Sequence, residues 1–515
     1  MFLQCSETIT RGTMLNRTFT LAMNGLDPIK IEVEVDARQG TPNFLVIGLQ
    51  DRAVDEARER ISAALLNCDI HLKARRTVVN LAPADVKKTS CSVELAIAIG
   101  LLKLYEEILI NTDDTVFFGE LSLDGEVKAI RGALPLVIAA RHLGFKKVVL
   151  PAANSDEVSV ISGIDLHPIV HLQQYLNFAR ENKPLPKITT QEFVPDEDRP
   201  YLLDFADIVS QQEAKRALEI AAAGGHNILL IGPPGAGKSM MAKALVSILP
   251  PLTERESLEV TAIYSICGEN KSKLIRQRPF RSPHHTISQV GIIGGSSQLL
   301  PGEISLSHRG ILFLDEFPEF SRSVLEALRQ PLEDGLVTIS RASGQVTYPA
   351  VFTLVAAANP CPCGFAGSLH RHCVCSDQFM ARYRKKLSGP ILDRIDMKIW
   401  VKEVEIKKLS QENNEAREKS AQIRQRVIKA REIQRRRLTG SKYITNSELL
   451  SKDVKKLCHL TPSAQDILEK AAQKFDLSAR SYFKTIQVAQ TIADLTAAAK
   501  IDSQHLAEAL QYRGE

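Results

Sequence analysis

The most informative stretch of the 515-residue chain lies at residues 227–240 and reads NILLIGPPGAGKSM. Its first five residues predict a short buried strand, and its end predicts the start of a helix. GPPGAGKS between them matches the phosphate-loop pattern in the context that the pattern requires. Backbone N–H groups close around phosphates there, Lys238 neutralises the β- and γ-phosphates, and the Ser239 hydroxyl ligates Mg²⁺. The residues expected to bind ATP are Gly232, Pro233, Pro234, Gly235, Ala236, Gly237, Lys238, Ser239 and Met240.

A second apolar run, ILFL at residues 311–314, is followed by two acids, Asp315 and Glu316. Asp315 is expected to hold Mg²⁺, and Glu316 to orient and activate the attacking water. The pair therefore favours hydrolysis over phosphoryl transfer to another acceptor. The alternative, in which both acids only cap the next helix, explains Glu316 poorly.

Three further polar residues are candidates for the same reaction. Asn359 ends a strand at residues 353–358 and is expected at the γ-phosphate or the water, although Asn-Pro is also a common turn. Arg394 is a candidate transition-state cation from a neighbouring subunit, and its alternative is a local pair with Asp393. Arg480 opens a helix and is expected to reach back to the nucleotide; a solvated helix charge is the alternative.

Composition excludes several protein classes. With 44% hydrophobic and 24% charged residues the chain can bury real cores and does not resemble a disordered protein. Neither a membrane-length apolar run nor a signal peptide is evident, and Met14 is a second possible start. Nine cysteines, an odd number, argue against a disulfide framework, so we expect a cytoplasmic protein. The excess of 65 Lys and Arg over 60 Asp and Glu is too small to indicate a partner.

Patterning predicts an α/β multidomain chain. Residues 14–178 alternate strand and helix patterns, with strands at 30–36, 77–81 and 147–150 and a helix at 51–66. Residues 179–200 are rich in proline and charge and predict a linker. Residues 201–401 hold the nucleotide motifs, and residues 402–515 are almost entirely helical in pattern.

Several motifs together make the chain similar to a known family. The segments at 204–208, 215–219 and 224–227, with the phosphate loop, resemble AAA+ ATPases related to the magnesium-chelatase ATPase subunit. PFRSPHH at 279–285 and NPCPCG at 359–364 narrow the resemblance to the bacterial ComM/YifB group. The similarity runs from about Met14 to the C-terminus.

This resemblance implies a homo-hexameric ring motor with a central AAA+ core that contains inserted hairpins and a C-terminal helical lid. Lys238, Ser239, Asp315 and Glu316 correspond to the Walker motifs and Asn359 to the first sensor. Arg394 corresponds to the trans finger and Arg480 to the second sensor, and the resemblance also places Asp207 and Ile208 at the nucleotide. The implied activity is an ATP-dependent DNA helicase that drives branch migration in natural transformation, on single-stranded and branched DNA and with recombination proteins as partners. The alternative is a chelatase-like motor that remodels a partner protein without binding DNA.

The N-terminal part resembles the α/β domain of Lon-type proteases. That chemistry needs a serine activated by a lysine. Ser92 aligns near the nucleophile, but Leu134 stands where the lysine is expected. We therefore expect a noncatalytic domain that acts as a scaffold or guides DNA.

Two Cys-x-Cys pairs form a candidate metal site: Cys361, Cys363, Cys373 and Cys375. Four thiolates can close a tetrahedral Zn²⁺ site, with His370 or His372 as possible substitutes. The one-residue spacer is shorter than usual, so reduced structural thiols and a redox sensor stay as alternatives.

Three basic stretches are candidates for DNA contacts. A hairpin with a Gly-containing turn is expected around 336–348, and in helicases of this branch such a hairpin points into the ring channel, with Arg341 available for phosphates. Lys271, Lys273 and Arg276 are expected in a helical insertion that faces the same channel. The densest basic run, 417–437, is first a packed lid helix. In each case a solvated charged surface is the alternative.

Overall fold

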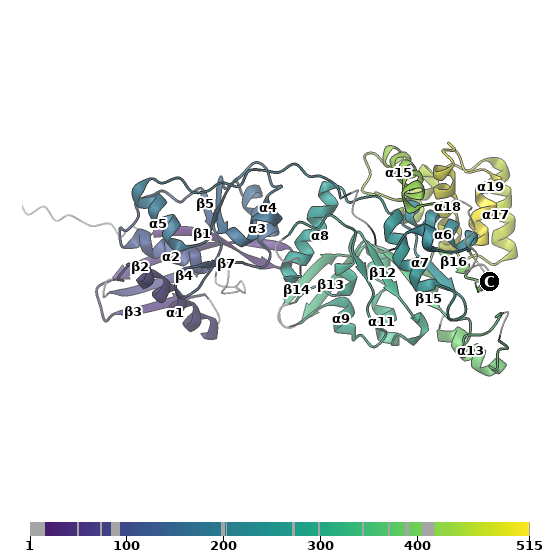
Figure 1. Ribbon diagram of the computed structural model, residues 1–515, viewed down its shortest axis with the longest axis horizontal. Helices are drawn as coiled ribbons and strands as arrows, with labels where there is room; N and C mark the ends of the chain where they lie inside the picture. The colour runs from purple at the N-terminus through teal and green to yellow at the C-terminus, as the bar shows by residue number, and fades with distance from the viewer. Residues whose placement is uncertain are drawn as a thin grey trace, which may run out of the picture. The chain divides into compact units, whose positions relative to one another are not determined.

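The computed structural model describes residues 16–48, 51–72, 75–83, 93–196, 201, 203–269, 273–296, 299–341, 344–368, 371–386, 391–403 and 417–513. The chain divides into two compact units (Figure 1). Unit 1 comprises residues 1–194 and 261–275, and unit 2 comprises residues 195–260 and 276–515. Within the described ranges, no helix has both the length and the apolar character to cross a membrane.

Unit 1 is built on a mixed seven-stranded sheet in the order β3-β4-β2-β1-β5-β8-β9. β2 pairs antiparallel with β1 and β4, whereas β5, β8 and β9 continue the sheet in parallel. The strands of this sheet are β1 Asn16–Asn24, β2 Asp27–Arg38, β3 Asn43–Ile47, β4 Arg76–Ala82, β5 Thr115–Phe117, β8 Lys147–Pro151 and β9 Asp165–Ile169. β6 Glu120–Leu121 and β7 Val127–Lys128 form a separate two-stranded sheet. The helices of unit 1 are α1 Asp51–Asn67, α2 Glu94–Leu104, α3 Ala133–His142, α4 Ser155–Val158 and α5 Leu172–Glu181.

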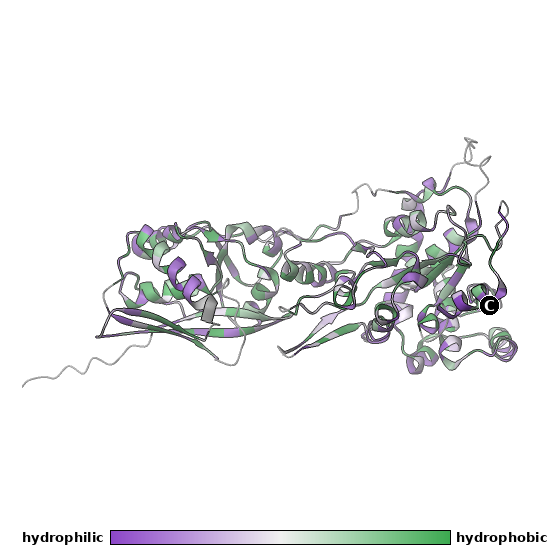
Figure 2. Ribbon diagram, turned by 90° about the horizontal axis from the view of Figure 1, so that it is seen from below, coloured by the Kyte–Doolittle hydropathy of each residue, from purple (hydrophilic) through white to green (hydrophobic). Residues whose placement is uncertain are grey.

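The residue pattern explains the elements of unit 1. In β2, Ile31, Val33 and Val35 are fully buried and alternate with half-buried Glu32 and Glu34, as expected of a strand with one wet face. α2 is apolar on all sides and is buried from its first residue to the ninth. Hydrophobic residues, green in Figure 2, occur in the helices and strands of both units. The three strands and the helix predicted for this part are confirmed.

Unit 2 contains a parallel five-stranded sheet in the order β11-β12-β15-β10-β16. Its strands are β11 Phe280–Arg281, β12 Ile311–Leu314, β15 Thr353–Ala358, β10 Ile228–Ile231 and β16 Met397–Trp400. β12 and β15 are buried along their whole length, which fits a central position in a parallel sheet. The expected mixed α/β architecture with a parallel-sheet core is confirmed.

Helices surround this sheet and continue into a helical C-terminal region, as expected. They are α6 Gln212–Gly224, α7 Lys238–Leu245, α9 Gln289–Ile293, α10 Glu303–Leu306, α11 Arg322–Ala327, α12 Pro331–Asp334, α13 Asp377–Lys386, α15 Ser420–Arg437, α16 Ser451–Leu457, α17 Pro462–Lys474, α18 Ala479–Leu495 and α19 Ser503–Gln511. α8, Glu254–Cys267, has residues in both units. Short 3₁₀ turns include η3 Phe205–Asp207 and η6 Leu392–Arg394.

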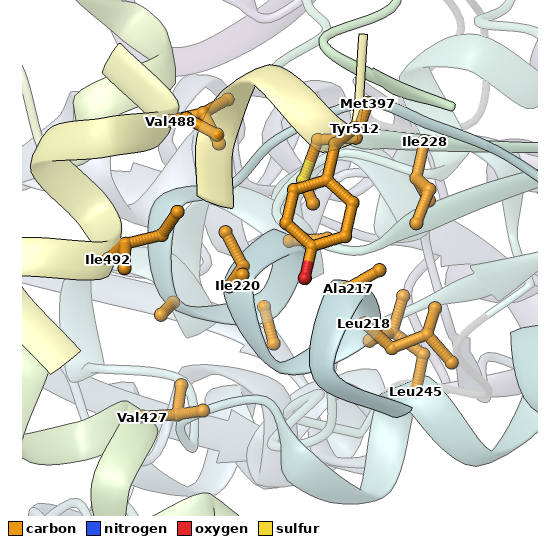
Figure 3. Packing of buried hydrophobic residues seen from close by; sticks show 14 of the residues in the cluster. Ala217, Leu218, Ile220, Ile228, Leu245, Met397, Val427, Val488, Ile492 and Tyr512 are labelled. Carbon is orange, nitrogen blue, oxygen red and sulfur yellow. The ribbon is translucent and has the colours of Figure 1, made fainter. Parts of the chain in front are cut away.

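The sheet and the C-terminal helices of unit 2 share one hydrophobic core. Figure 3 shows Tyr512 close to Met397 of β16, Ile228 of β10 and Ala217 of α6, with Val488 and Ile492 of α18 nearby. These side chains are almost fully buried. Movement of the C-terminal helices therefore disturbs the same packing that holds the sheet.

The predicted hairpin is present as β13 Leu336–Arg341 paired antiparallel with β14 Gly344–Pro349. Its register pairs Leu336 with Pro349 and Arg341 with Gly344. Residues 182–196, within the predicted linker, form neither helix nor strand.

Lys273 and Arg276 are expected in a helical insertion. The described residues 273–278 form no helix themselves and follow α8 in the chain. α8 ends at Cys267 because Gly268 adopts φ +73° and its N–H bonds back to the carbonyl of Ser265. A left-handed glycine is a common helix terminator. The chain then returns along α8, where the Ile275 N–H donates to the Thr261 hydroxyl at 2.9 Å.

Candidate functional site

Three strand ends meet at the carboxyl edge of the unit 2 sheet. β10 leads into the phosphate loop, β12 into Asp315 and Glu316, and β15 into Asn359. Because β15 lies between β10 and β12 and all three run parallel, their polar termini converge at one edge. This edge is where open α/β sheets bind their ligands.

Glycines permit the path of the phosphate loop. Gly235 and Gly237 have φ +80° and +87°, which L side chains rarely adopt. Gly237 is also the N-cap of α7, so the loop ends at a helix N-terminus that favours anions. Gly232 lies against the Val401 carbonyl, and a Cβ atom at Gly232 would stand 2.3 Å from that oxygen.

Lys238 is held across the loop. Its Nζ donates to the carbonyls of Gly232 at 2.6 Å and Pro233 at 2.9 Å, and to Asn359 Oδ1 at 3.2 Å. Burial lowers the pKa of Lys238, and the charge of Asp315 opposes this shift. Lys238 and Asn359 therefore meet, as the sequence predicts for groups that share one phosphate.

The predicted Mg²⁺ ligands also meet. The Ser239 hydroxyl donates to Asp315 Oδ2 at 2.7 Å, joining the first turn of α7 to the end of β12. Hydroxyl and carboxylate oxygens suit Mg²⁺, which binds through few protein ligands together with phosphate and water. The donor set thus fits a nucleotide-bound Mg²⁺ held by Ser239 and, directly or through water, by Asp315.

Glu316 is exposed beside this pair and contacts a residue to which the sequence analysis assigned no role. His285 Nδ1 lies 3.2 Å from Glu316 Oε2, and the His285 ring packs against His284 with centroids 4.1 Å apart. Glu316 itself has φ +51°, an uncommon conformation for a residue with a side chain. His285 therefore stands within ion-pair distance of the predicted base. The adjacent histidines in PFRSPHH were the available signal.

Asp207 and Ile208 are placed by η3. The Asp207 carboxylate accepts the N–H of Asp204, Asp207 is exposed and Ile208 is buried in the unit 2 core. Met240 packs partly buried against the same core. Their contact with a nucleotide stays a prediction.

Arg394 and Arg480 lie together on Glu333 of α12. Arg394 Nη2 pairs with Glu333 Oε1, and Arg480 Nη2 lies 2.5 Å from the same oxygen. Burial opposes ionisation of Glu333, but Arg480 and then Arg394 outweigh it and hold its pKa below the usual range. Burial, followed by the charge of Arg480, lowers the pKa of Arg394.

This pair of arginines lies at the amino edge of the unit 2 sheet, which is the edge where the parallel strands begin. Arg394 precedes β16, and its carbonyl accepts from the side chain of Asn227, which precedes β10. β10 and β16 pair in parallel register from Ile228 with Met397, so Arg394 stands where the strands begin. A four-residue strand spans about 13 Å. Arg394 and the phosphate loop therefore lie at opposite edges of the sheet.

A buried ionic network supports this amino edge. Asp396 accepts the N–H of Asn227 at 2.7 Å and pairs with Lys484, whose Nζ also donates to the Arg394 carbonyl. Burial opposes ionisation of Asp396, yet above all the charge of Lys484 holds its pKa below the usual range. His226 is fully buried, and its Nε2 lies 2.7 Å from Thr491 Oγ1.

The stability of unit 2 is expected to fall in acid because of His226. Burial lowers its pKa to about 4, against the opposing charge of Asp396. A histidine in the unfolded state titrates near pH 6.5. Between about pH 6.5 and pH 4 the unfolded state therefore binds more protons than the folded state, and the free energy of unfolding decreases as the pH is lowered. We expect a loss of about 2 kcal/mol between pH 7 and 4.5.

Urea unfolding followed by the fluorescence of Trp400, the only tryptophan, measures this effect. The matched variant His226→Gln keeps a polar partner for Thr491 and is expected to show a shallower pH slope. Equal slopes for the two proteins would contradict the assignment to His226.

The four cysteines of the candidate metal site come together. Their Sγ atoms all lie within 4.8 Å of one another, and the group includes no histidine among the described residues. His372 is exposed, and His370 lies outside the described residues.

The predicted DNA contacts are scattered. Arg341 is exposed at the end of β13, next to the hairpin turn. Lys273 is exposed and Arg276 half-buried in the irregular chain after α8. Lys271 lies outside the described residues. Of the two residues compared with the Lon-type catalytic pair, Ser92 also lies outside the described residues, and Leu134 is fully buried in α3. The roles of all these residues stay predictions.

Comparisons with known proteins match this architecture along the chain. The family model "Magnesium chelatase, subunit ChlI" matches residues 204–409, "Subunit ChlI of Mg-chelatase" matches 33–154, and "Magnesium chelatase, subunit ChlI C-terminal" matches 417–513. The chain is 40% identical over 500 residues to competence protein ComM of Haemophilus influenzae, covering 96% of both chains.

Other similar proteins include one relative of nearly full length and one partial relative. The chain is 39% identical over 501 residues to the uncharacterized protein YifB of Escherichia coli, covering 97% of both. It is also 27% identical over 166 residues to DNA repair protein RadA of Bacillus subtilis, covering 31% of this chain and 34% of RadA. Identity near 40% over nearly the full length shows that the chain belongs to the ComM/YifB family of magnesium-chelatase-like AAA+ proteins.

Proposed function

We propose that the protein is an ATP hydrolase that works as a homo-hexameric ring and translocates on DNA, promoting branch migration of recombination intermediates. Lys238 and Ser239 bind MgATP together with Asp315, Glu316 activates the water, and Asn359 senses the γ-phosphate. The contacts of these residues at one sheet edge support the hydrolysis step.

The proposal of a ring is supported mainly by the distance between the amino and carboxyl edges of the unit 2 sheet. Arg394 is buried at the amino edge and cannot meet the γ-phosphate bound at the carboxyl edge of its own sheet. A neighbouring subunit that docks its amino edge on the first subunit's phosphate loop supplies the cation in trans. Because Glu333 holds Arg480 beside Arg394, we propose that both arginines act across this boundary.

DNA as the substrate is supported by the names of two relatives, a competence protein and a DNA repair protein. The exposed Arg341 beside the hairpin turn is suited to phosphate contacts, which carry no sequence information. Single-stranded and branched DNA are the proposed substrates, and the cytoplasm the proposed compartment. The Lon-like unit 1 is proposed to be a noncatalytic scaffold.

Displacement of a labelled strand from a three-way junction tests this function. Wild-type protein with MgATP is expected to displace the strand, and Lys238→Ala to leave it in place, because the β- and γ-phosphates lose their cation. Lys243→Ala, an exposed lysine on the same helix, is the matched control and should match wild type. Displacement should weaken steeply with salt, as expected for phosphate contacts.

Equal displacement by wild type and Lys238→Ala would contradict an ATP-driven motor. The alternative is a chelatase-like motor that remodels a partner protein. It would be favoured if single-stranded DNA left the rate of ATP hydrolysis unchanged and the protein did not retard DNA in a gel.

A further inference from the structure

The four-cysteine cluster has the dimensions of a metal site. Cys361 Sγ lies 3.3 Å from Cys363 Sγ and 3.6 Å from Cys373 Sγ, and Cys363 Sγ lies 3.6 Å from Cys373 Sγ. A disulfide bond is about 2.05 Å long, so these sulfurs are not bonded pairs. In a tetrahedral Zn(thiolate)₄ site with Zn–S of about 2.3 Å, neighbouring sulfurs lie about 3.8 Å apart. The sulfurs therefore outline a coordination tetrahedron.

Backbone donors complete the surroundings of the sulfurs. The Ala366 N–H donates to Cys361 Sγ at 3.2 Å, and the Cys363 N–H donates to Cys375 Sγ at 3.4 Å. Hydrogen bonds from backbone amides stabilise anionic sulfur and are typical of the second shell of metal sites. Gly364, with φ +84°, turns the chain between Cys363 and Ala366.

We propose that Cys361, Cys363, Cys373 and Cys375 bind one Zn²⁺ as a structural ion. Soft thiolates in tetrahedral arrangement select zinc or iron. Four protein ligands leave no open position, which is the arrangement of structural rather than catalytic zinc.

The bound ion holds the loop that carries Asn359. Cys361 follows Asn359 by two residues, and Gly364 packs so closely on Pro234 of the phosphate loop that a Cβ atom there would stand 2.8 Å from the proline ring. A cavity of about 400 Å³ is lined by Cys361, Asn359 and Glu316. The metal therefore fixes one wall of the space in which water meets the γ-phosphate.

The far end of the loop is tied to the sheet. A Cβ atom at Gly367 would lie 3.0 Å from the Trp400 ring, and the Ser368 hydroxyl donates to Glu403 Oε1 at 2.8 Å. The ion would add to these contacts and to those at Pro234 by holding the cysteine end of the segment. We infer that zinc is a positioning element for Asn359, an inference that rests on the proposed ATP hydrolysis.

Metal analysis of protein purified without chelators tests the site directly. Inductively coupled plasma mass spectrometry is expected to find about one zinc per chain in wild type. The double variant Cys373→Ser/Cys375→Ser, which leaves the fully buried Cys361 intact, should hold at least about tenfold less zinc because two ligands are lost. Cys267→Ser, outside the cluster, is the matched control and should keep its zinc.

Spectroscopy of the Co²⁺-exchanged protein gives a readout independent of activity. Four thiolates around Co²⁺ are expected to give the intense visible bands of tetrahedral sulfur coordination in wild type and in Cys267→Ser, and not in the double variant. The proposal would be overturned if the wild-type protein contained iron in place of zinc. It would also be overturned if the wild-type protein took up neither zinc nor Co²⁺ and its four cluster thiols could all be titrated.

Nucleotide assays separate this proposal from the proposed function. The double variant is expected to bind a fluorescent ATP analogue but to hydrolyse ATP about tenfold or more slowly, because Asn359 loses its fixed place. Zinc loss without a change in hydrolysis would overturn the positioning role while leaving the metal site. Wild-type protein that binds zinc and hydrolyses no ATP would contradict the proposed function alone.

Discussion

Replacing Arg394 with alanine is expected to reduce the rate of ATP hydrolysis by about 10³–10⁵-fold while leaving nucleotide binding intact. The guanidinium of Arg394 lies at the amino edge of the sheet. In the proposed ring it would act on the nucleotide of the next subunit and contribute only when the terminal phosphate is transferred. Steady-state hydrolysis and equilibrium binding of a fluorescent ATP analogue measure the two quantities separately.

Mixing two inactive variants tests whether Arg394 acts across subunits. Arg394→Ala has an intact phosphate loop, and Lys238→Ala has an intact arginine. In a randomly mixed ring about one quarter of the subunit boundaries would join an intact loop to an intact arginine. Hydrolysis by the mixture should therefore recover, although each variant alone is inactive. No recovery in rings shown by mass to contain both variants would contradict trans action.

Two controls distinguish loss of the cation from loss of structure. Arg394→Lys keeps a charge at Glu333 but not the forked guanidinium, and is expected to be well folded and still strongly impaired. Arg329→Ala removes a half-exposed arginine that pairs with Glu326, and is expected to hydrolyse ATP like wild type. An unfolded Arg394→Lys would indicate that the residue serves the fold.

Replacing Glu316 with glutamine is expected to slow ATP hydrolysis by about 10²–10⁴-fold, because the amide cannot accept the proton of the attacking water. The side chain keeps its size, and the Mg²⁺ ligands Ser239 and Asp315 keep their contact. The variant should therefore bind MgATP and retain it. Single-turnover hydrolysis and retention of radiolabelled ATP after gel filtration measure both effects.

Glu319→Gln is the matched control for Glu316. Glu319 lines the same cavity but pairs with Lys386 on α13, and its replacement should leave hydrolysis within about twofold of wild type. A Glu316→Gln variant that turns over ATP at the wild-type rate would contradict the assignment of the base. Equal losses in both variants would indicate a general effect of charge in the cavity.

Much of the fold was predictable because short-range patterns encode it. The alternation in residues 30–36 defines β2, and the apolar runs before Gly232, Asp315 and Asn359 define three parallel strands. Parallel strands carry their polar termini at one edge, so the meeting of Lys238, Asn359, Ser239 and Asp315 followed from local signals. The sequence alone did not show that α8 ends before Lys273 and Arg276, because this end depends on the left-handed conformation of Gly268.

The sequence by itself thus determined the phosphate loop, its acids and the strands that carry them, since each depends on residues close together in the chain. Only the tertiary structure decided that Arg394 and Arg480 share Glu333 at the opposite edge of the sheet and that His285 reaches Glu316. These relations join residues up to 147 positions apart (480 − 333). They depend on strand order and crossovers, which no local periodicity encodes.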